Sequence, residues 1–147
     1  MIIQATYSEA TKQAMANVRS MQHFEWYVIP LLAMLIYIYV NEAQNKQWNI
    51  FMAGIAGWVF EWLGEFGNML WCYFSGYAPL WTASGKSSLL ILAGINIEIS
   101  LMFALYGLVV TKALPKDSSL RILGVPNRLI VILAFSIFCG LVETTLN

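Results

Sequence analysis

The sequence predicts an all-α protein, built as a polytopic transmembrane bundle of about four spanning helices with an N-terminal amphipathic helix. Of the 147 residues, 59% are hydrophobic and only 11% are charged, whereas soluble domains usually carry about 25% charged residues. The mean hydropathy is +0.66. A water-soluble fold of this composition would expose large apolar patches that drive association. We therefore expect an integral, multi-pass membrane protein with the lipid bilayer as its solvent and partner.

The first expected element is an amphipathic helix over residues 6–22. Thr6 and Glu9 have the spacing of a capping box, in which a hydroxyl at the N-cap is followed three residues later by a carboxylate. Apolar residues then recur at helical spacing, while the opposite face is polar. The segment is too polar to cross a bilayer, so we expect it to lie at the membrane interface.

Four apolar segments predict the spanning helices, at residues 24–40, 48–74, 89–110 and 128–147. The first carries aromatic residues toward its ends, which is typical of the interfacial belt. A polar hairpin, a loop over residues 76–88 and an interruption rich in Pro and Gly separate the four segments. The last segment stops without a basic flank, which suggests a longer natural chain. Together these elements form a single domain over residues 1–147.

The basic residues favour an orientation with both termini outside. That arrangement leaves five Lys and Arg residues on the inner side, whereas the opposite arrangement leaves three. Basic residues gather on the cytoplasmic side of membrane proteins. The sequence does not identify which membrane holds the protein.

The acidic and basic residues are separated along the chain. None of the eight Lys and Arg residues lies within the expected spans, although Lys112 and Arg128 flank them. In contrast, five of the eight acidic residues lie inside or at the ends of the apolar segments. A carboxylate at bilayer depth costs at least ~2.5 kcal/mol, so it must be protonated, hydrated, hydrogen-bonded or paired with a cation. These five acids are Glu25, Glu61, Glu65, Glu98 and Glu143.

Glu61 and Glu65 give the strongest local signal for a functional site. They are four residues apart, so they share one face of a helix. Two neighbouring carboxyl groups resist joint ionisation, so one keeps a proton unless a cation lies between them. Gly57 and Gly64 flank this face and would let another helix approach closely. Trp58 and Asn68 extend the polar face.

Further candidates lie on the later segments. Glu98 and Asn96 occupy different faces of the third segment, and Glu143 lies near the end of the fourth. Each carboxyl group also has a purely structural interpretation, as a protonated hydrogen-bonding group between helices, and the tryptophans have one as packing residues. The candidate polar-site residues are Trp58, Glu61, Trp62, Glu65, Asn68, Asn96, Glu98 and Glu143.

Several function classes are excluded. The formal net charge is zero, so no basic field exists to recruit nucleic acid. His23 is the one histidine, and Cys72 and Cys139 are the two cysteines, so we predict free thiols and no metal site. Residues 84–87 mimic only the tail of a phosphate-binding loop. No motif identifies a cofactor or a known family.

Three functions remain open. In the first, the carboxyl groups bind or conduct a cation or proton. In the second, the protein is a membrane enzyme that uses a buried Glu as general acid or base on an apolar lipid or isoprenoid. In the second case Trp58 and Trp62 would stabilise a cationic intermediate. In the third, the chain is a non-catalytic subunit of a larger membrane complex. We expect an oligomer or a complex in each case, because one chain of this size is too small to enclose a transport pathway by itself.

Overall fold

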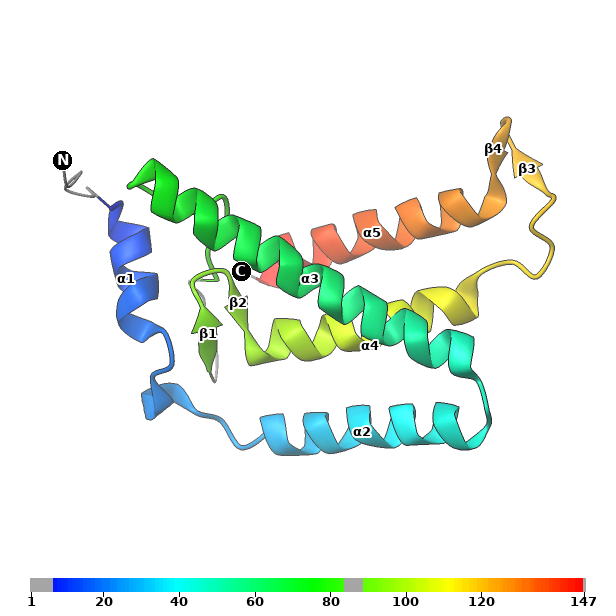
Figure 1. Ribbon diagram of the computed structural model, residues 1–147, viewed down its shortest axis with the longest axis horizontal. Helices are drawn as coiled ribbons and strands as arrows, with labels where there is room; N and C mark the ends of the chain where they lie inside the picture. Colours follow the sequence, from blue (N-terminus) through cyan, green and yellow to red (C-terminus); the bar gives the residue numbers. More distant parts are fainter. Residues whose placement is uncertain (1–6, 84–88, 147) are drawn as a thin grey trace.

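The computed structural model describes residues 7–83 and 89–146, with side chains apart from those of His23 and residues 142–146. Three helices, α2, α3 and α4, pack against one another, and α3 crosses α4 along much of its length (Figure 1). Helix α5 packs on α4, and α1 stands at one end of the molecule against strand β1. The helices are α1 (Glu9–Asn17), the short 3₁₀ helix η1 (Met21–His23), α2 (Val28–Gln44), α3 (Trp48–Ser75), α4 (Ile97–Ala113) and α5 (Asn127–Leu146).

Two small β-hairpins interrupt the helical fold, and each leads directly into a helix. In the first, Leu90 pairs with Asn96 and Leu92 with Ile95 in an antiparallel register. In the second, Arg121 pairs with Pro126. The strands are β1 (Leu90–Leu92), β2 (Ile95–Asn96), β3 (Arg121–Ile122) and β4 (Val125–Pro126).

The helix predicted over residues 89–110 is wrong at its start, because α4 begins only at Ile97 and the first hairpin precedes it. Asn96 is the N-cap of α4, and its side chain accepts a hydrogen bond of 2.7 Å from the backbone N–H of Ile99. The residues before it turn at Gly94 and pair as strands. An apolar run alone does not distinguish a buried strand from a buried helix.

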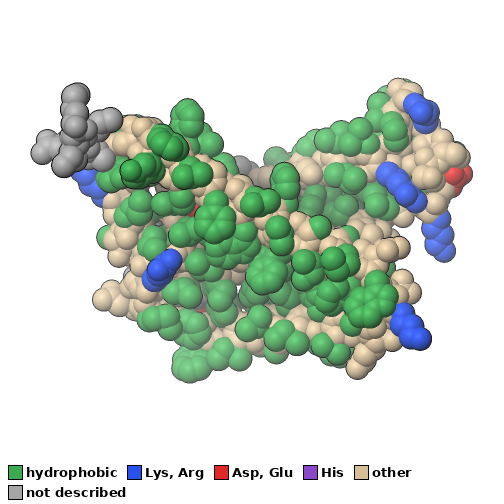
Figure 2. All heavy atoms as spheres, viewed as in Figure 1, with side chains coloured by type: hydrophobic (Ala, Val, Ile, Leu, Met, Phe, Trp, Pro, Cys, Tyr) green, Lys and Arg blue, Asp and Glu red, His purple; other side chains and the backbone are tan. Residues whose placement is uncertain are grey.

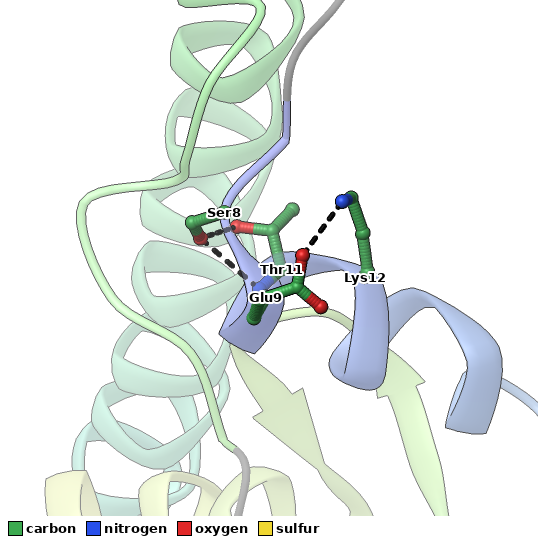
Figure 3. Close-up of polar contacts among 4 residues, drawn as sticks. All are labelled: Ser8, Glu9, Thr11 and Lys12. Atoms are coloured by element: carbon green, nitrogen blue, oxygen red, sulfur yellow. Dashed lines mark hydrogen bonds and ion pairs between the residues drawn. The ribbon is translucent and has the colours of Figure 1, made fainter.

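The N-terminal helix is shorter than the predicted segment 6–22, and its cap is different. Thr6 lies outside the described residues, and the N-cap is Ser8, whose Oγ accepts from the Thr11 N–H at 3.2 Å (Figure 3). Glu9 forms an exposed ion pair with Lys12 at 2.7 Å. The helix ends at Asn17 because Val18 leaves the helical conformation, with a ψ of 126°, and Arg19 then takes a positive φ of 59°. The Arg19 N–H then donates to the Leu90 carbonyl at 2.7 Å, which ties this segment to β1.

Small residues set the close contact between α3 and α4. A Cβ atom on Gly107 would lie 2.2 Å from the Ala53 carbonyl oxygen, so the backbones touch here. Gly57 faces Gly107 at the same contact, as its sequence position predicted, whereas Gly64 has nothing within 4 Å of its Cβ position. The prediction that Gly64 admits a neighbouring helix is therefore wrong.

Among the residues whose side chains the structure describes, no helix is both long and apolar enough to cross a membrane. The predicted fold class, an all-α transmembrane bundle, is therefore wrong; the fold is mostly helical with two short hairpins. Helices α2 and α4 have 17 residues each, which at ~1.5 Å per residue is less than the ~30 Å hydrocarbon core of a bilayer. Helix α3 has 28 residues but carries Glu61 and Glu65.

The contact at Gly107 predicts a steric effect. Gly107→Ala should lower the free energy of unfolding by about 1–3 kcal/mol, because the added methyl group meets backbone atoms that cannot rotate away. Gly64→Ala is the matched control and should be neutral or slightly stabilising, since its site is open and alanine favours helix. Thermal unfolding followed by circular dichroism measures both. Equal stability of the two variants would show that the α3–α4 contact is looser than described.

Candidate functional site

The centre of the candidate site is the buried carboxylate of Glu65 on α3, which is only 2% exposed. Its Oε1 accepts a hydrogen bond from the Gly94 N–H at 2.9 Å. Its Oε2 accepts from the Trp81 indole N–H at 3.0 Å and from the Asn68 side-chain amide at 3.3 Å. Both oxygens are therefore acceptors for N–H donors, which is the arrangement that satisfies an ionised carboxylate.

Asn68, one helical turn further along α3, holds the backbone that follows the helix. Its Oδ1 accepts from the N–H groups of Leu80 at 2.7 Å and Trp81 at 3.3 Å. Its Nδ2 donates to the Trp81 carbonyl at 3.0 Å. The side chain is 1% exposed, so these bonds replace water for buried backbone groups. Asn68 therefore fixes Trp81 where its indole reaches Glu65.

Gly94, in the turn of the first hairpin, is required by this packing. A Cβ atom there would lie 2.5 Å from Glu65 Oε2, 2.6 Å from Asn68 Nδ2 and 2.7 Å from Trp81 Cδ1. Only a residue without a side chain lets the turn approach the carboxylate this closely. The site thus joins three parts of the chain: α3, the segment around Trp81 and the β1–β2 turn.

Glu61 lies one turn before Glu65, and its environment differs. Its Oε2 is buried and has no hydrogen-bond partner among the described residues. Burial, with the neighbouring Glu65 charge as a second cause, raises the pKa of Glu61 from 4.5 to about 7. Burial also raises the pKa of Glu65, but the hydrogen bonds from Gly94, Asn68 and Trp81 act in the opposite direction. The pair titrates together, and the donors favour leaving the negative charge on Glu65 and the proton on Glu61.

The other predicted site residues lie elsewhere. Trp58 donates through its indole N–H to Ser100 Oγ at 2.8 Å, which links α3 to α4. Trp62 packs near Phe66, with ring centroids 6.1 Å apart. Asn96 caps α4, and Glu98 accepts a hydrogen bond from the Tyr27 hydroxyl. Glu143 lies on α5 in the part whose side chains are outside the description.

Sequence reasoning missed Trp81 and Gly94, which complete the Glu65 site. Gly94 interrupts an apolar run, and an isolated Gly there is a signal for a turn. Trp81 gave no signal, because its role depends on a contact across 16 residues. Sequence reasoning also placed Glu42 in a polar hairpin, although Glu42 is 3% exposed and forms an ion pair with Lys112 of α4. Within the described residues, no group of three or more His, Cys, Asp or Glu side chains could hold a metal ion.

Comparison with known proteins gives the broader class. The model of an uncharacterized membrane protein family matches residues 8–147. The chain belongs to this family. It is 43% identical over 140 residues to an uncharacterized protein of Archaeoglobus fulgidus. The match covers 95% of this chain and 66% of that relative, so the chain spans about two thirds of the relative's length. No solved structure matches.

Membership in this family identifies a membrane protein, and the names of the family and the relative assign no activity. The site therefore has to be interpreted from its own chemistry. The Glu65 carboxylate accepts hydrogen bonds from three donors. Beside it, the buried Oε2 of Glu61 has no donor among the described residues.

The Glu65 contacts predict unequal effects of two similar substitutions. Glu65→Gln should lower the free energy of unfolding by about 1–3 kcal/mol. The glutamine NH₂ group would replace a carboxylate oxygen that accepts hydrogen bonds, so one N–H donor would face another N–H donor. Glu61→Gln, one turn away, should not destabilise the protein at pH 8, because it removes a charge next to Glu65. Denaturant unfolding of both variants at pH 8 tests this. The structural role of Glu65 is refuted if its variant is as stable as the unmodified chain.

Proposed function

We propose that this membrane protein binds and releases a proton at Glu61 near neutral pH, and that burial, together with the negative charge of Glu65 beside it, sets the proton affinity. The observation that carries the proposal is the buried Oε2 of Glu61, which has no hydrogen-bond partner among the described residues and lies beside a carboxylate that already accepts three N–H donors. A proton is the smallest ligand that neutralises such a group without displacing its neighbours.

The donor set favours a proton over a metal cation. A metal ion needs several oxygen lone pairs directed at one point. Both oxygens of Glu65 already accept N–H groups, and the oxygen of Asn68 accepts two backbone N–H groups. The positive ends of these N–H dipoles face the carboxylate from the directions that a cation would occupy. Of the two ligands that the sequence left open, a cation or a proton, we therefore propose the proton.

Proton binding at Glu61 would be coupled to the stability of the folded chain. When Glu61 is ionised, two negative charges lie one helical turn apart, and one of them has a buried oxygen without a donor. This state disfavours the fold that buries both carboxyl groups, because burial and the Glu65 charge both oppose ionisation of Glu61. Protonation of Glu61 removes this cost. The site would therefore convert a change in pH into a change in the stability of the folded chain.

This coupling predicts the sign of a pH dependence. The pKa of Glu61 is about 7 in the folded chain against an ordinary value of 4.5, so the folded state binds more protons between these two values. Stability contributed by this group is full below about 4.5 and falls as the pH rises toward 7. The melting temperature of the unmodified protein should therefore decrease over this window relative to that of Glu61→Gln. Parallel curves for the two proteins would contradict the proposal.

Infrared spectroscopy gives a second reading that does not depend on unfolding. The absorption of a protonated carboxyl group should disappear as the pH rises through about 7, and it should be absent from this range in Glu61→Gln. Glu9→Gln, at an exposed acid of α1, is the matched control and should leave the transition unchanged. A transition that survives in Glu61→Gln would assign the proton to another group.

A second candidate function, chemistry on an apolar lipid or isoprenoid, is favoured by a pocket between α2, α3 and α4. The pocket has a volume of about 300 Å³ and an almost wholly apolar lining, within the size range of ligand sites. The polar atoms of Tyr39 and Trp58 are already bonded, to the Ala104 carbonyl and to Ser100. Trp58 precedes Glu61 by one helical turn, so an apolar chain in the pocket would lie near a proton donor. The pocket is lined by Leu32, Leu35, Ile36, Tyr39, Val40, Ala43, Phe51, Ile55, Trp58 and Ala104.

Filling the pocket tests this second function. Ala43→Trp should occupy part of the volume and reduce the amount of lipid or isoprenoid that copurifies with the protein severalfold, measured by mass spectrometry. Ala56→Trp is the matched control, because Ala56 is exposed on α3 and does not line the pocket. If both variants retain the same lipids in the same amounts as the unmodified protein, the pocket does not bind them.

A further inference from the structure

The tip of the β3–β4 hairpin is an exposed apolar point at the opposite end of the molecule from α1 (Figure 1). Leu123 is 98% exposed, and Leu120 and Ile122 are more than half exposed. Leu123 and Gly124 form the turn with positive φ angles of 52° and 81°. A leucine in this conformation is uncommon and disfavoured by its Cβ. The turn therefore holds a large apolar side chain outward at a position where a polar or small residue would be less costly.

Basic side chains surround this tip. Lys116, Arg121 and Arg128 are exposed, and Asp117 is the one acid in the segment 114–128. Figure 2 shows Lys and Arg side chains gathered with hydrophobic ones at this end of the molecule. The Asp117 carboxylate accepts hydrogen bonds from the backbone N–H and the hydroxyl of Ser119, at 2.8 and 2.6 Å. The field outside the tip is therefore positive.

Hydrogen bonds to the backbone hold the segment in place. Arg128 donates to the carbonyls of Pro115 at 3.2 Å and Lys116 at 3.3 Å, and Arg121 donates to the Gly124 carbonyl at 3.2 Å. Asn127 donates to the Asp117 carbonyl at 2.8 Å. The apolar tip and its basic surroundings are thus presented as one ordered unit.

The two hairpins differ in how much of each is buried by the rest of the protein. Both hairpins turn at a glycine and lead into a helix, but Ala93 and Ile95 of the first are buried, and its turn is bonded to Glu65. In the part of the chain that the structure describes, Leu123 has no such cover.

We propose that the β3–β4 hairpin docks on the surface of an anionic bilayer. Leu120, Ile122 and Leu123 enter the interfacial layer, while Lys116, Arg121 and Arg128 contact lipid phosphates. The chain belongs to a membrane protein family, so a bilayer is available. Apolar side chains combined with Lys and Arg are the composition that binds anionic lipid interfaces. This role uses none of the residues of the proposed proton site.

The shape of the hairpin favours a lipid surface over a protein partner. Its strands have two residues each, so the tip protrudes and offers little area. A stable protein interface needs about 800 Å² from each partner, and a fluid interface needs no matching cavity. An acidic protein or a second copy of this chain remains an outcome that the experiment distinguishes.

The test places a polarity-sensitive fluorophore on Leu123→Cys, in a Cys139→Ser background where Cys72 is buried. The purified full chain is reconstituted with vesicles of zwitterionic lipid alone or mixed with anionic lipid. With anionic lipid, the emission should shift to the blue and be quenched by lipid-borne quenchers. The double variant Lys116→Glu, Arg121→Glu should weaken docking on the order of tenfold or more. Lys12→Glu, Lys46→Glu, with the same change in net charge, should not.

Three results would overturn the proposal. One is quenching of the label by an aqueous quencher alone, in both lipid mixtures. Another is equal lipid quenching of the unmodified and charge-reversed tips, because phosphate contact would then play no part. The third is a blue shift in detergent without lipid that grows with protein concentration, which would assign the tip to a contact between copies or with a protein partner.

Discussion

The buried carboxylate of Glu65 is the constraint on which the rest of the arrangement depends. A buried carboxyl group is costly unless its lone pairs are satisfied, and the chain brings three N–H donors to it. These donors come from α3 itself, from Trp81 and from the Gly94 turn. Satisfying this one group therefore places the connection after α3 and the first hairpin against the same face of the helix.

The position of that hairpin decides the surrounding packing. Leu90 and Ala93 pack with Ala14 of α1 and Ala83 in a small core, and the Leu90 carbonyl accepts from Arg19. The hairpin ends at Asn96, which caps α4, and α4 then packs along α3 through Gly107. A helix that began earlier, as its apolar sequence suggested, would have no turn to offer Glu65.

Three acids illustrate three ways to accommodate a buried carboxyl group. Glu65 is surrounded by neutral donors, and Glu42 is paired with the ammonium group of Lys112. The buried Oε2 of Glu61 has neither partner among the described residues, and burial raises the pKa of Glu61. Two neighbouring carboxyl groups in unlike environments take on different protonation states.

The large apolar side chains exposed on α2, α3 and α5 would drive association in water, and membership in a membrane protein family gives a physical reason for them.

The sequence by itself determined the properties that depend on near neighbours. The apolar segment at 48–74 anticipated α3 to within one residue, and the spacing of Glu61 and Glu65 anticipated their coupling, because a helix brings residues four apart to one face. Tertiary structure decided that Trp81 and the Gly94 turn complete the site and that Lys112 reaches Glu42. These contacts join residues 16 to 70 positions apart, and local periodicity carries no signal for them. The hairpin before α4 is a local pairing, which the apolar run did not distinguish from a helix although the isolated Gly94 is a turn signal. The expectation of spanning helices was wrong. Caps and turns, which composition does not measure, limit α2 and α4 to 17 residues each, and the longer α3 carries Glu61 and Glu65.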